Sequence, residues 1–159
     1  VGLKNEDEVE TAFERIVANA RQYDPKADIE GVLVVKMAPV GHEVIIGATR
    51  YPVFGPLLMF GLGGIFVEIF KDVEFRLAPV ERSEAERMIQ SIKGYKILQG
   101  YRGKPRADIQ CLEKILVSLS DMVLNHPEIL EMDINPLMVH DDGKGATVAD
   151  CRIILQPLS

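Results

Sequence analysis

The chain has 159 residues, of which 47% are hydrophobic and 26% are charged, and its formal net charge is −6. These values are typical of a globular protein with one core, and they exclude a disordered or collagen-like chain. Because a net acidic chain is a poor ligand for polyanions, we expect no nucleic acid among its partners.

The most apolar stretch, residues 53–70, is interrupted by Pro56, by four glycines and by Glu68. It is no transmembrane helix, and we expect no membrane partner. Two cysteines, Cys111 and Cys151, are too few for a disulfide framework and are interpreted as buried thiols in a reducing compartment. No signal peptide is visible, so we expect a cytoplasmic location.

The first predicted element is a helix over residues 6–20. Asn5, followed three residues later by Glu8, is typical of a capped helix start. Two β-type segments follow, over residues 31–37 and 43–49, with a turn that contains proline and glycine between them. This pattern predicts an antiparallel hairpin.

Short strands and two helices follow in the middle of the chain. Residues 61–64, Gly-Leu-Gly-Gly, form a predicted flexible loop after a strand. Ser83 with Glu86 matches the capping-box pattern at a helix start. We predict strands over residues 57–60, 65–70 and 73–77, helices over residues 83–94 and 107–124, and a loop between those two helices.

The last predicted element is a β-hairpin with arms over residues 131–140 and 146–155. Asp142-Gly143 between the arms is a strong hairpin dipeptide. All the predicted elements together indicate an α+β fold, in which helices pack on a mainly antiparallel sheet within one unit.

Polar residues face one another across this hairpin. If the Asp-Gly dipeptide is the centre of the turn, Asn135 lies opposite Asp150, and Asp133 lies opposite Arg152. Because residues two apart share a strand face, all four side chains project from one face. Asn135 and Asp150 then offer two oxygens to one cation, and Mg²⁺ prefers carboxylate and amide oxygens.

The spacing alone leaves two interpretations of this face open. One is a magnesium site, and the other is an exposed polar face with a surface ion pair between Asp133 and Arg152. The apolar neighbours in both arms favour metal, because a polar group in a half-buried strand costs free energy unless it is paired or metal-bound. Pro136 lacks an N–H donor and indicates a bulge, and a different loop length would move the register by one residue.

Two further segments are candidates for nucleotide contact. Gly61, Gly63 and Gly64 would let backbone N–H groups approach phosphate, although a tight turn or bulge is the simpler explanation. The loop is no Walker A loop, because no Gly-Lys-Ser/Thr follows. A buried strand is the simplest interpretation of residues 34–37; the alternative is a strand whose backbone edge meets adenine, with Glu43 near the ribose. The residues of this strand are Val34, Val35, Lys36 and Met37.

Several motifs, in the same order, resemble the ATP-grasp domain of ADP-forming acetyl-CoA synthetases. Residues 41–47 read GHEVIIG, residues 59–68 read MFGLGGIFVE, residues 131–137 read EMDINPL and residues 149–153 read ADCRI. The succinyl-CoA synthetase β-subunit is similar more distantly. The resemblance covers nearly the whole chain and implies the C-terminal part of an ATP-grasp fold.

The resemblance also implies roles for individual residues. It assigns Mg²⁺ to Asn135 and Asp150, the pair that the hairpin register selects independently. Asp133 is the implied catalytic residue, which interacts with the phosphorylated histidine that carries phosphate between half-sites. The hinge strand falls on residues 34–37 and the acidic residue after it on Glu43. ATP or ADP and Mg²⁺ are the implied cofactors.

The implied reaction converts an acid, CoA and ATP reversibly to acyl-CoA, ADP and phosphate through a phosphohistidine. The implied partners are the CoA-binding and phosphohistidine-bearing domains or subunit of the synthetase. The family's upstream lysine-bearing strand is absent, so we expect residues 1–159 to be a single ATP-grasp subdomain that is inactive alone and binds ATP weakly or not at all. The alternative is the synthetase-like regulatory domain of a protein lysine acetyltransferase.

Overall fold

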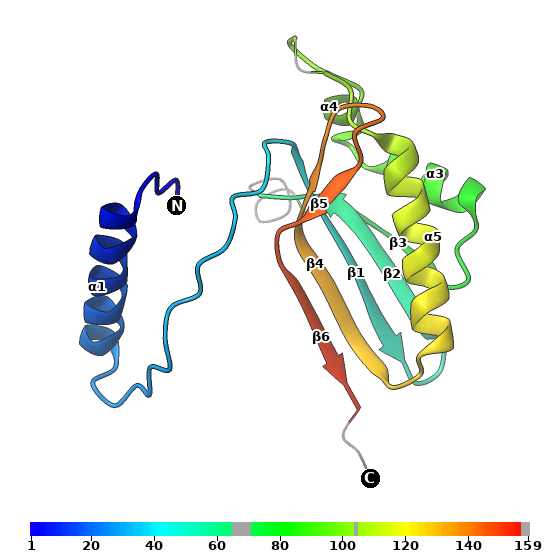
Figure 1. The fold of residues 1–159 in the computed structure, drawn as a ribbon. Helices are drawn as coiled ribbons and strands as arrows, with labels where there is room; N and C mark the ends of the chain where they lie inside the picture. Colours follow the sequence, from blue (N-terminus) through cyan, green and yellow to red (C-terminus); the bar gives the residue numbers. More distant parts are fainter. Residues whose placement is uncertain (65–70, 104, 157–159) are drawn as a thin grey trace. The chain divides into compact units, whose positions relative to one another are not determined.

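A computed structural model describes residues 1–64, 71–103 and 105–156 (Figure 1). The chain forms two compact units, Val1–Met37 and Ala38–Ser159. The strand predicted over residues 65–70 lies outside the described residues. No described helix has both the length and the apolar character needed to cross a membrane.

The second unit is built on a six-stranded sheet in which every pairing is antiparallel. The strand order is β3-β2-β1-β4-β5, and β6 also pairs with β4. The strands are β1 (His42–Tyr51), β2 (Gly55–Leu62), β3 (Val73–Leu77), β4 (Ile129–Val139), β5 (Ala146–Val148) and β6 (Cys151–Leu155). The described helices of this unit are α3 (Arg82–Ser91), α4 (Tyr95–Leu98) and α5 (Ile109–Asn125). The predicted α+β fold with a mainly antiparallel sheet is confirmed.

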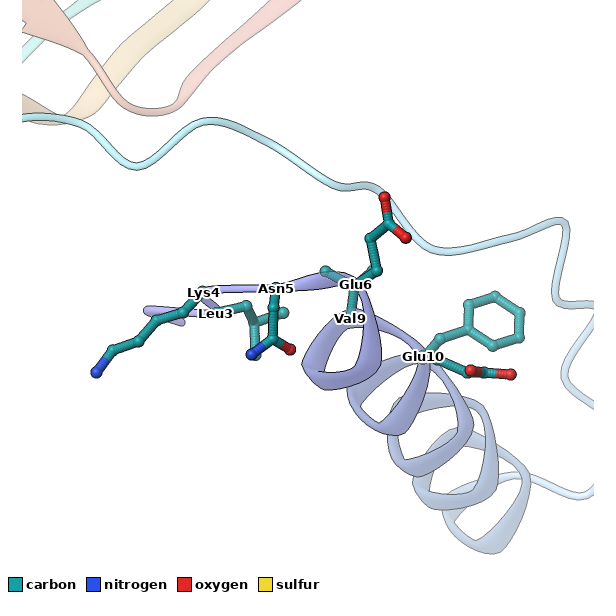
Figure 2. Close-up of a pocket in the computed structure, with 7 residues that line it drawn as sticks. Leu3, Lys4, Asn5, Glu6, Val9 and Glu10 are labelled. Atoms are coloured by element: carbon teal, nitrogen blue, oxygen red, sulfur yellow. The ribbon is translucent and has the colours of Figure 1, made fainter.

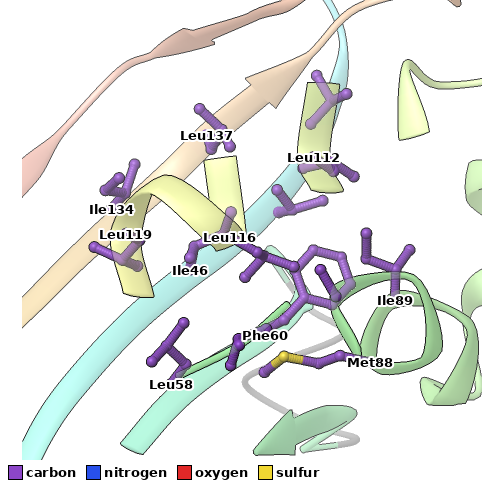
Figure 3. Packing of buried hydrophobic residues seen from close by; sticks show 14 of the residues in the cluster. Ile46, Leu58, Phe60, Met88, Ile89, Leu112, Leu116, Leu119, Ile134 and Leu137 are labelled. Atoms are coloured by element: carbon purple, nitrogen blue, oxygen red, sulfur yellow. The ribbon is translucent and has the colours of Figure 1, made fainter. Parts of the chain in front are cut away.

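The core lies between one face of the sheet and helices α3 and α5 (Figure 3). Alternate strand residues such as Ile46 and Phe60 are fully buried there, together with Leu116 of α5 and Met88 of α3. Each such side chain contributes about 1.5–3 kcal/mol by leaving water. This packing fixes which face of every strand is turned away from the helices.

The opposite face of the sheet, which we call the open face, carries the alternate residues of the same strands. Tyr51 of β1 and both Phe75 and Leu77 of β3 are about half exposed on it, at 48%, 48% and 50%. Such a face is available to a ligand or to another part of a larger protein.

The first unit contains helix α1 (Glu6–Tyr23), whose start confirms the sequence prediction. The Glu8 backbone N–H donates to the Asn5 side chain at 2.9 Å, and the Asn5 amide donates back to Glu8 Oε1 at 3.4 Å. The helix ends before Asp24, three residues later than predicted.

Residues 31–37 do not form the predicted strand. Leu33, Val34 and Val35 have exposed fractions of 86%, 68% and 69%. Strand β1, their expected partner, has both edges filled by β2 and β4. The predicted hairpin over residues 31–37 and 43–49 is therefore wrong, because an apolar run does not show which segments compete for a strand edge.

Two helix starts also differ from the prediction. Helix α3 begins at Arg82, so Ser83 lies inside the first turn and the expected capping box does not form; Glu81 is the N-cap and makes no side-chain cap hydrogen bond. Helix α5 begins after Asp108, whose side chain accepts the Cys111 N–H at 3.0 Å. The short helix α4 lies in the segment predicted as a loop.

Candidate nucleotide and metal site

The C-terminal hairpin has the predicted register. Asp133 is directly opposite Arg152, and the Asn135 N–H donates to the Asp150 carbonyl at 3.1 Å. Gly143, in the turn, has a φ of 77°, a left-handed conformation that favours glycine. The Asp-Gly dipeptide is therefore the centre of the turn, and the two predicted metal ligands lie on neighbouring backbones.

Asp108 anchors this hairpin to the start of α5. One carboxylate oxygen accepts the Cys111 N–H and the other accepts the Gly145 N–H at 2.9 Å. Burial raises the pKa of Asp108, but hydrogen bonds from the backbones of Gly145, Cys111 and Gly143, with the nearby charge of Lys114, outweigh it. The pKa therefore lies below its ordinary value. An ionised Asp108 fixes the turn that sets the register of the site.

Pro136 marks a bulge, as its lack of an N–H predicts. The pairing of β1 with β4 shifts between Val44 and Ile46, so Ile45 faces two residues, Asn135 and Pro136, on β4. The buried residues on either side of the bulge are Met132, Ile134, Leu137 and Val139. Asn135 lies between them and is exposed.

Asp133 forms the ion pair that the sequence left as an alternative to metal binding. Arg152 Nε donates to Asp133 Oδ1 at 3.2 Å, and Arg152 Nη2 donates to Glu131 Oε1 at 3.1 Å. The side chains of Asp133 and Arg152 are 31% and 64% exposed. This ion pair and a metal site at Asn135 and Asp150 do not exclude each other, because they use different residues.

Asp150 lies in the break between β5 and β6, where its Oδ1 accepts the Cys151 N–H at 2.9 Å. Cys151 is exposed and Cys111 is only partly buried, so the prediction of two buried thiols is wrong. Partial loss of solvent still raises the pKa of the Cys151 thiol, and the negative charges of Asp133 and Asp150 raise it further. The thiol thus lies within electrostatic reach of both carboxylates. A concentration of negative charge at an exposed strand break favours a cation.

Glu43 and the glycines after β2 are brought together. The Gly63 N–H donates to the Glu43 carbonyl at 2.7 Å, and a Cβ on Gly64 would lie 3.3 Å from Glu43 Oε2. Gly61 belongs to β2 rather than to a flexible loop, and a Cβ there would lie 2.7 Å from the Asp72 carbonyl. Close backbone packing therefore explains Gly61, and the predicted loop over residues 61–64 begins too early.

One row of paired residues crosses the open face. Arg152 is opposite Asp133, which is opposite Gly47; Gly47 is opposite Met59, which is opposite Phe75. A Cβ on Gly47 would lie 3.8 Å from the Asp133 Cβ. Gly47 therefore adds no side chain beside Asp133, and the Met59 methyl group lies 3.6 Å from the same point. The sequence prediction missed this residue, although a glycine inside a β-branched strand signals a close approach.

The structure thus places the predicted site residues in three groups. Asp133, Asn135 and Asp150 lie in the hairpin, and Glu43 lies with the glycines at the start of β1 and the end of β2. Residues 34–37 belong to the first unit and have no strand partner.

Asn135 and Asp150 fit a magnesium ion by their chemistry, since one offers an amide oxygen and the other a carboxylate. Asp150 Oδ1 already accepts a backbone N–H, which leaves Oδ2 for a cation. Within the described ranges, no three His, Cys, Asp or Glu side chains are grouped to hold a metal. An ion at this pair would therefore need phosphate oxygens and water to complete its shell.

A hollow of about 690 Å³ lies beside the start of α1 and is lined by residues of that helix and the segment before it (Figure 2). Leu3, Val9 and Phe13 supply its apolar lining, and Lys4, Glu6 and Glu10 are polar. It contains none of the predicted site residues.

An antiparallel sheet with an Asn–Asp pair on one hairpin and a glycine turn beside an acid defines the class of this protein. Residues 1–155 match a family model described as an ATP-grasp domain, and the chain belongs to that family. The predicted fold is confirmed.

Its relatives include ADP-forming CoA ligases. The chain is 48% identical over 155 residues to the β subunit of ADP-forming acetate–CoA ligase I of Pyrococcus furiosus, and the match covers 98% of this chain and 66% of the relative. It is 50% identical over 153 residues to the ADP-forming 4-hydroxybutyrate–CoA ligase of Nitrosopumilus maritimus, covering 96% of this chain and 22% of the relative. The chain therefore spans only part of these proteins.

Solved structures of related synthetases are similar to this chain in sequence and in fold. Acetyl-coenzyme A synthetase 1 of Ca. Korarchaeum cryptofilum, in complex with coenzyme A, Ca-AMPCP and HgCl+, is 46% identical with a TM-score of 0.90, covering 98% of this chain and 67% of that chain. The same enzyme with coenzyme A and Mg-AMPPCP, its phosphohistidine segment pointing towards the nucleotide binding site, is 42% identical with a TM-score of 0.83 and the same coverage. Magnesium with a nucleotide is thus found within the family.

Proposed function

We propose that this chain is the nucleotide- and magnesium-binding part of an ADP-forming acyl-CoA synthetase. The parent reaction would be the reversible conversion of an acid, CoA and ATP to acyl-CoA, ADP and phosphate through a phosphohistidine. The relatives described above are CoA ligases, which favours a synthetase over the regulatory domain of a lysine acetyltransferase. CoA-binding and phosphohistidine-bearing domains or a subunit would be its partners.

The observation that carries the proposal is the pairing of Asn135 with Asp150 across the hairpin. The Asn135 amide oxygen and Asp150 Oδ2 would hold Mg²⁺, while the Cys151 N–H keeps the Asp150 carboxylate oriented through Oδ1. Bound Mg²⁺ would neutralise charge on the nucleotide phosphates during phosphoryl transfer.

The neighbouring residues have complementary proposed roles. The Gly63 N–H holds the Glu43 carbonyl, so Gly64 would bring its backbone N–H close to the phosphates, and the Glu43 carboxylate would accept hydrogen bonds from the ribose hydroxyls. The adenine contact predicted for residues 34–37, which belong to the first unit, stays a prediction. Asp133, two residues before Asn135 on β4, would accept a hydrogen bond from the imidazole of the phosphorylated histidine.

Substitution of the metal pair in the complete enzyme tests the proposal. We expect Asn135→Ala and Asp150→Asn each to slow Mg-dependent phosphoryl exchange between phosphohistidine and ADP by about a hundredfold, because one of two protein ligands is lost. Asp141→Asn is a matched control, since this exposed acid lies on the same hairpin but pairs with Lys144. Near-normal exchange in both metal-pair variants would refute the proposal.

A further inference from the structure

Arg152 holds Asp133 in a fixed arrangement on the open face. Its Nε bonds Asp133 Oδ1 at 3.2 Å and its Nη2 bonds Glu131 Oε1 at 3.1 Å. Asp133 and Glu131 are two residues apart on β4 and therefore share a face. A planar guanidinium with two donor groups bridges such a pair, whereas an ammonium supplies only a point charge.

The other flank of Asp133 faces strand backbone and the methyl group of Met59. Gly47, its partner on β1, has no side chain, and the site of its missing Cβ lies 3.8 Å from the Asp133 Cβ. Within the described ranges, Asp133 Oδ1 accepts a hydrogen bond from Arg152, and Oδ2 accepts none from another protein group. Arg152 thus holds one of the two carboxylate oxygens of Asp133, whose side chain is 31% exposed.

We propose that Arg152 is the positioning residue for phosphoryl exchange at this site. It holds Oδ1 of Asp133 so that Oδ2 meets the imidazole N–H of the incoming phosphorylated histidine. This inference rests on the proposed role of Asp133. Arg152 acts through Asp133 and does not itself contact the phosphate.

Because Arg152 is exposed, its effect on the reaction rate can be measured separately from its effect on the stability of the fold. An ion pair whose arginine is 64% exposed contributes little to folding, so variants at this position are expected to fold. By contrast, a small displacement of a reacting group lowers the rate of the chemical step strongly. Loss of Arg152 should therefore change the rate of the chemical step more than the stability of the protein.

Single-turnover dephosphorylation of the phosphohistidine by MgADP in the complete enzyme tests the inference. We expect Arg152→Gln to lower the maximal rate about ten- to a hundredfold with little change in KM for MgADP. Arg152→Lys should have a rate between those of the parent and Arg152→Gln, because lysine keeps the positive charge but lacks the two planar donor groups of the guanidinium. Glu131→Gln is the matched control, since it leaves the Arg152–Asp133 contact intact, and it should stay within about threefold of the parent rate.

A double-mutant cycle tests whether Arg152 affects the rate through Asp133. In an Asp133→Asn background, Arg152→Gln should lower the maximal rate less than about twofold, because the carboxylate that Arg152 positions is already absent. Full, multiplicative losses, or a raised KM with an unchanged rate, would show direct contact with the substrate and overturn the inference. A normal rate in Asp133→Asn would overturn the proposed role of Asp133 itself. A slow Asp133→Asn beside a normal Arg152→Gln would overturn only the positioning role.

Discussion

At the scale of single residues, the hairpin concentrates acidic groups around one thiol. The pKa of Cys151 is raised by burial and then by the charges of Asp133 and Asp150, so the thiol reports on both carboxylates without any ligand. In a Cys111→Ser background, we expect Asp150→Asn to lower the pKa of Cys151 and to speed its alkylation near pH 8, because more thiolate is present. The dependence of the iodoacetamide reaction rate on pH measures this.

Asp121→Asn, a change at an exposed residue of α5, is the control for that experiment. If the pH dependence of alkylation is unchanged in Asp150→Asn, the Asp150 carboxylate lies too far from the Cys151 thiol to affect it. The placement of Asp150 in the candidate site would then be wrong.

The residues of the hairpin were predictable because their register depends on local chemistry. The Asp-Gly dipeptide selects a tight turn, and that turn alone sets Asn135 opposite Asp150. Gly47 was not predicted, because its importance depends on Asp133 of β4, which approaches it only in the folded sheet. The bond from Arg152 to Glu131 likewise needed the structure, since Glu131 is two positions from the directly opposed residue.

At the scale of elements, Arg50 of β1 closes the C-terminal end of α5. Its guanidinium donates to the carbonyl oxygens of Val123, His126 and Ile129. Val123 and His126 lie at the end of α5 and Ile129 begins β4, so Arg50 links the helix end to the sheet, and its cation complements the helix dipole. We expect Arg50→Met to lower the free energy of unfolding by about 2 kcal/mol, measured by urea denaturation.

Arg87→Met, at an exposed position of α3, should change that free energy by less than about 0.5 kcal/mol. If the two substitutions have equal effects, Arg50 is not a structural cap.

The stability that Asp108 contributes by linking the hairpin to α5 depends on pH. The pKa of Asp108 is depressed in the folded chain, so its ionised form stabilises the fold at every pH above the ordinary value of 3.8. That stabilisation is lost as the pH falls through the lower, folded pKa. We therefore expect Asp108→Asn to destabilise the chain at neutral pH and the difference from the parent to shrink below about pH 4.

Thermal unfolding of both proteins between neutral and acidic pH measures the Asp108 contribution. A difference that stays constant down to the acid limit would mean that the carboxylate does not stabilise the turn through its charge.

Periodicity predicted the three long helices and the Asp-Gly turn predicted the hairpin, but the short helix α4, the cap of α3 and the segment over residues 31–37 were not predicted correctly. Its apolar run has the composition of a strand, yet β2 and β4 occupy the edges of β1. Competition among segments for one strand edge is a tertiary effect that a local pattern cannot show. The same reason explains why Gly61 extends β2, since its partner Ile45 continues the ladder.

At the scale of the whole molecule, the sheet has one face packed on helices and one open face that carries the candidate site. The chain spans 66% of the Pyrococcus furiosus subunit, and its described residues place two protein donors at the metal pair. We therefore expect the 159-residue chain to bind MgADP with a dissociation constant above about 1 mM, because the phosphates and water must supply most of the shell. Isothermal titration measures this affinity, and submillimolar binding would contradict the expectation.

The most direct test of the metal pair uses Mn²⁺ as a paramagnetic substitute for Mg²⁺, since even weak binding broadens nearby NMR signals. With millimolar MnADP, we expect the amide signals of Asn135 and Cys151 to broaden in the parent chain and to stay sharp in Asp150→Asn. Equal broadening in both proteins, or broadening centred on the exposed turn at Asp141 and Asp142, would contradict the assignment of the cation to Asn135 and Asp150.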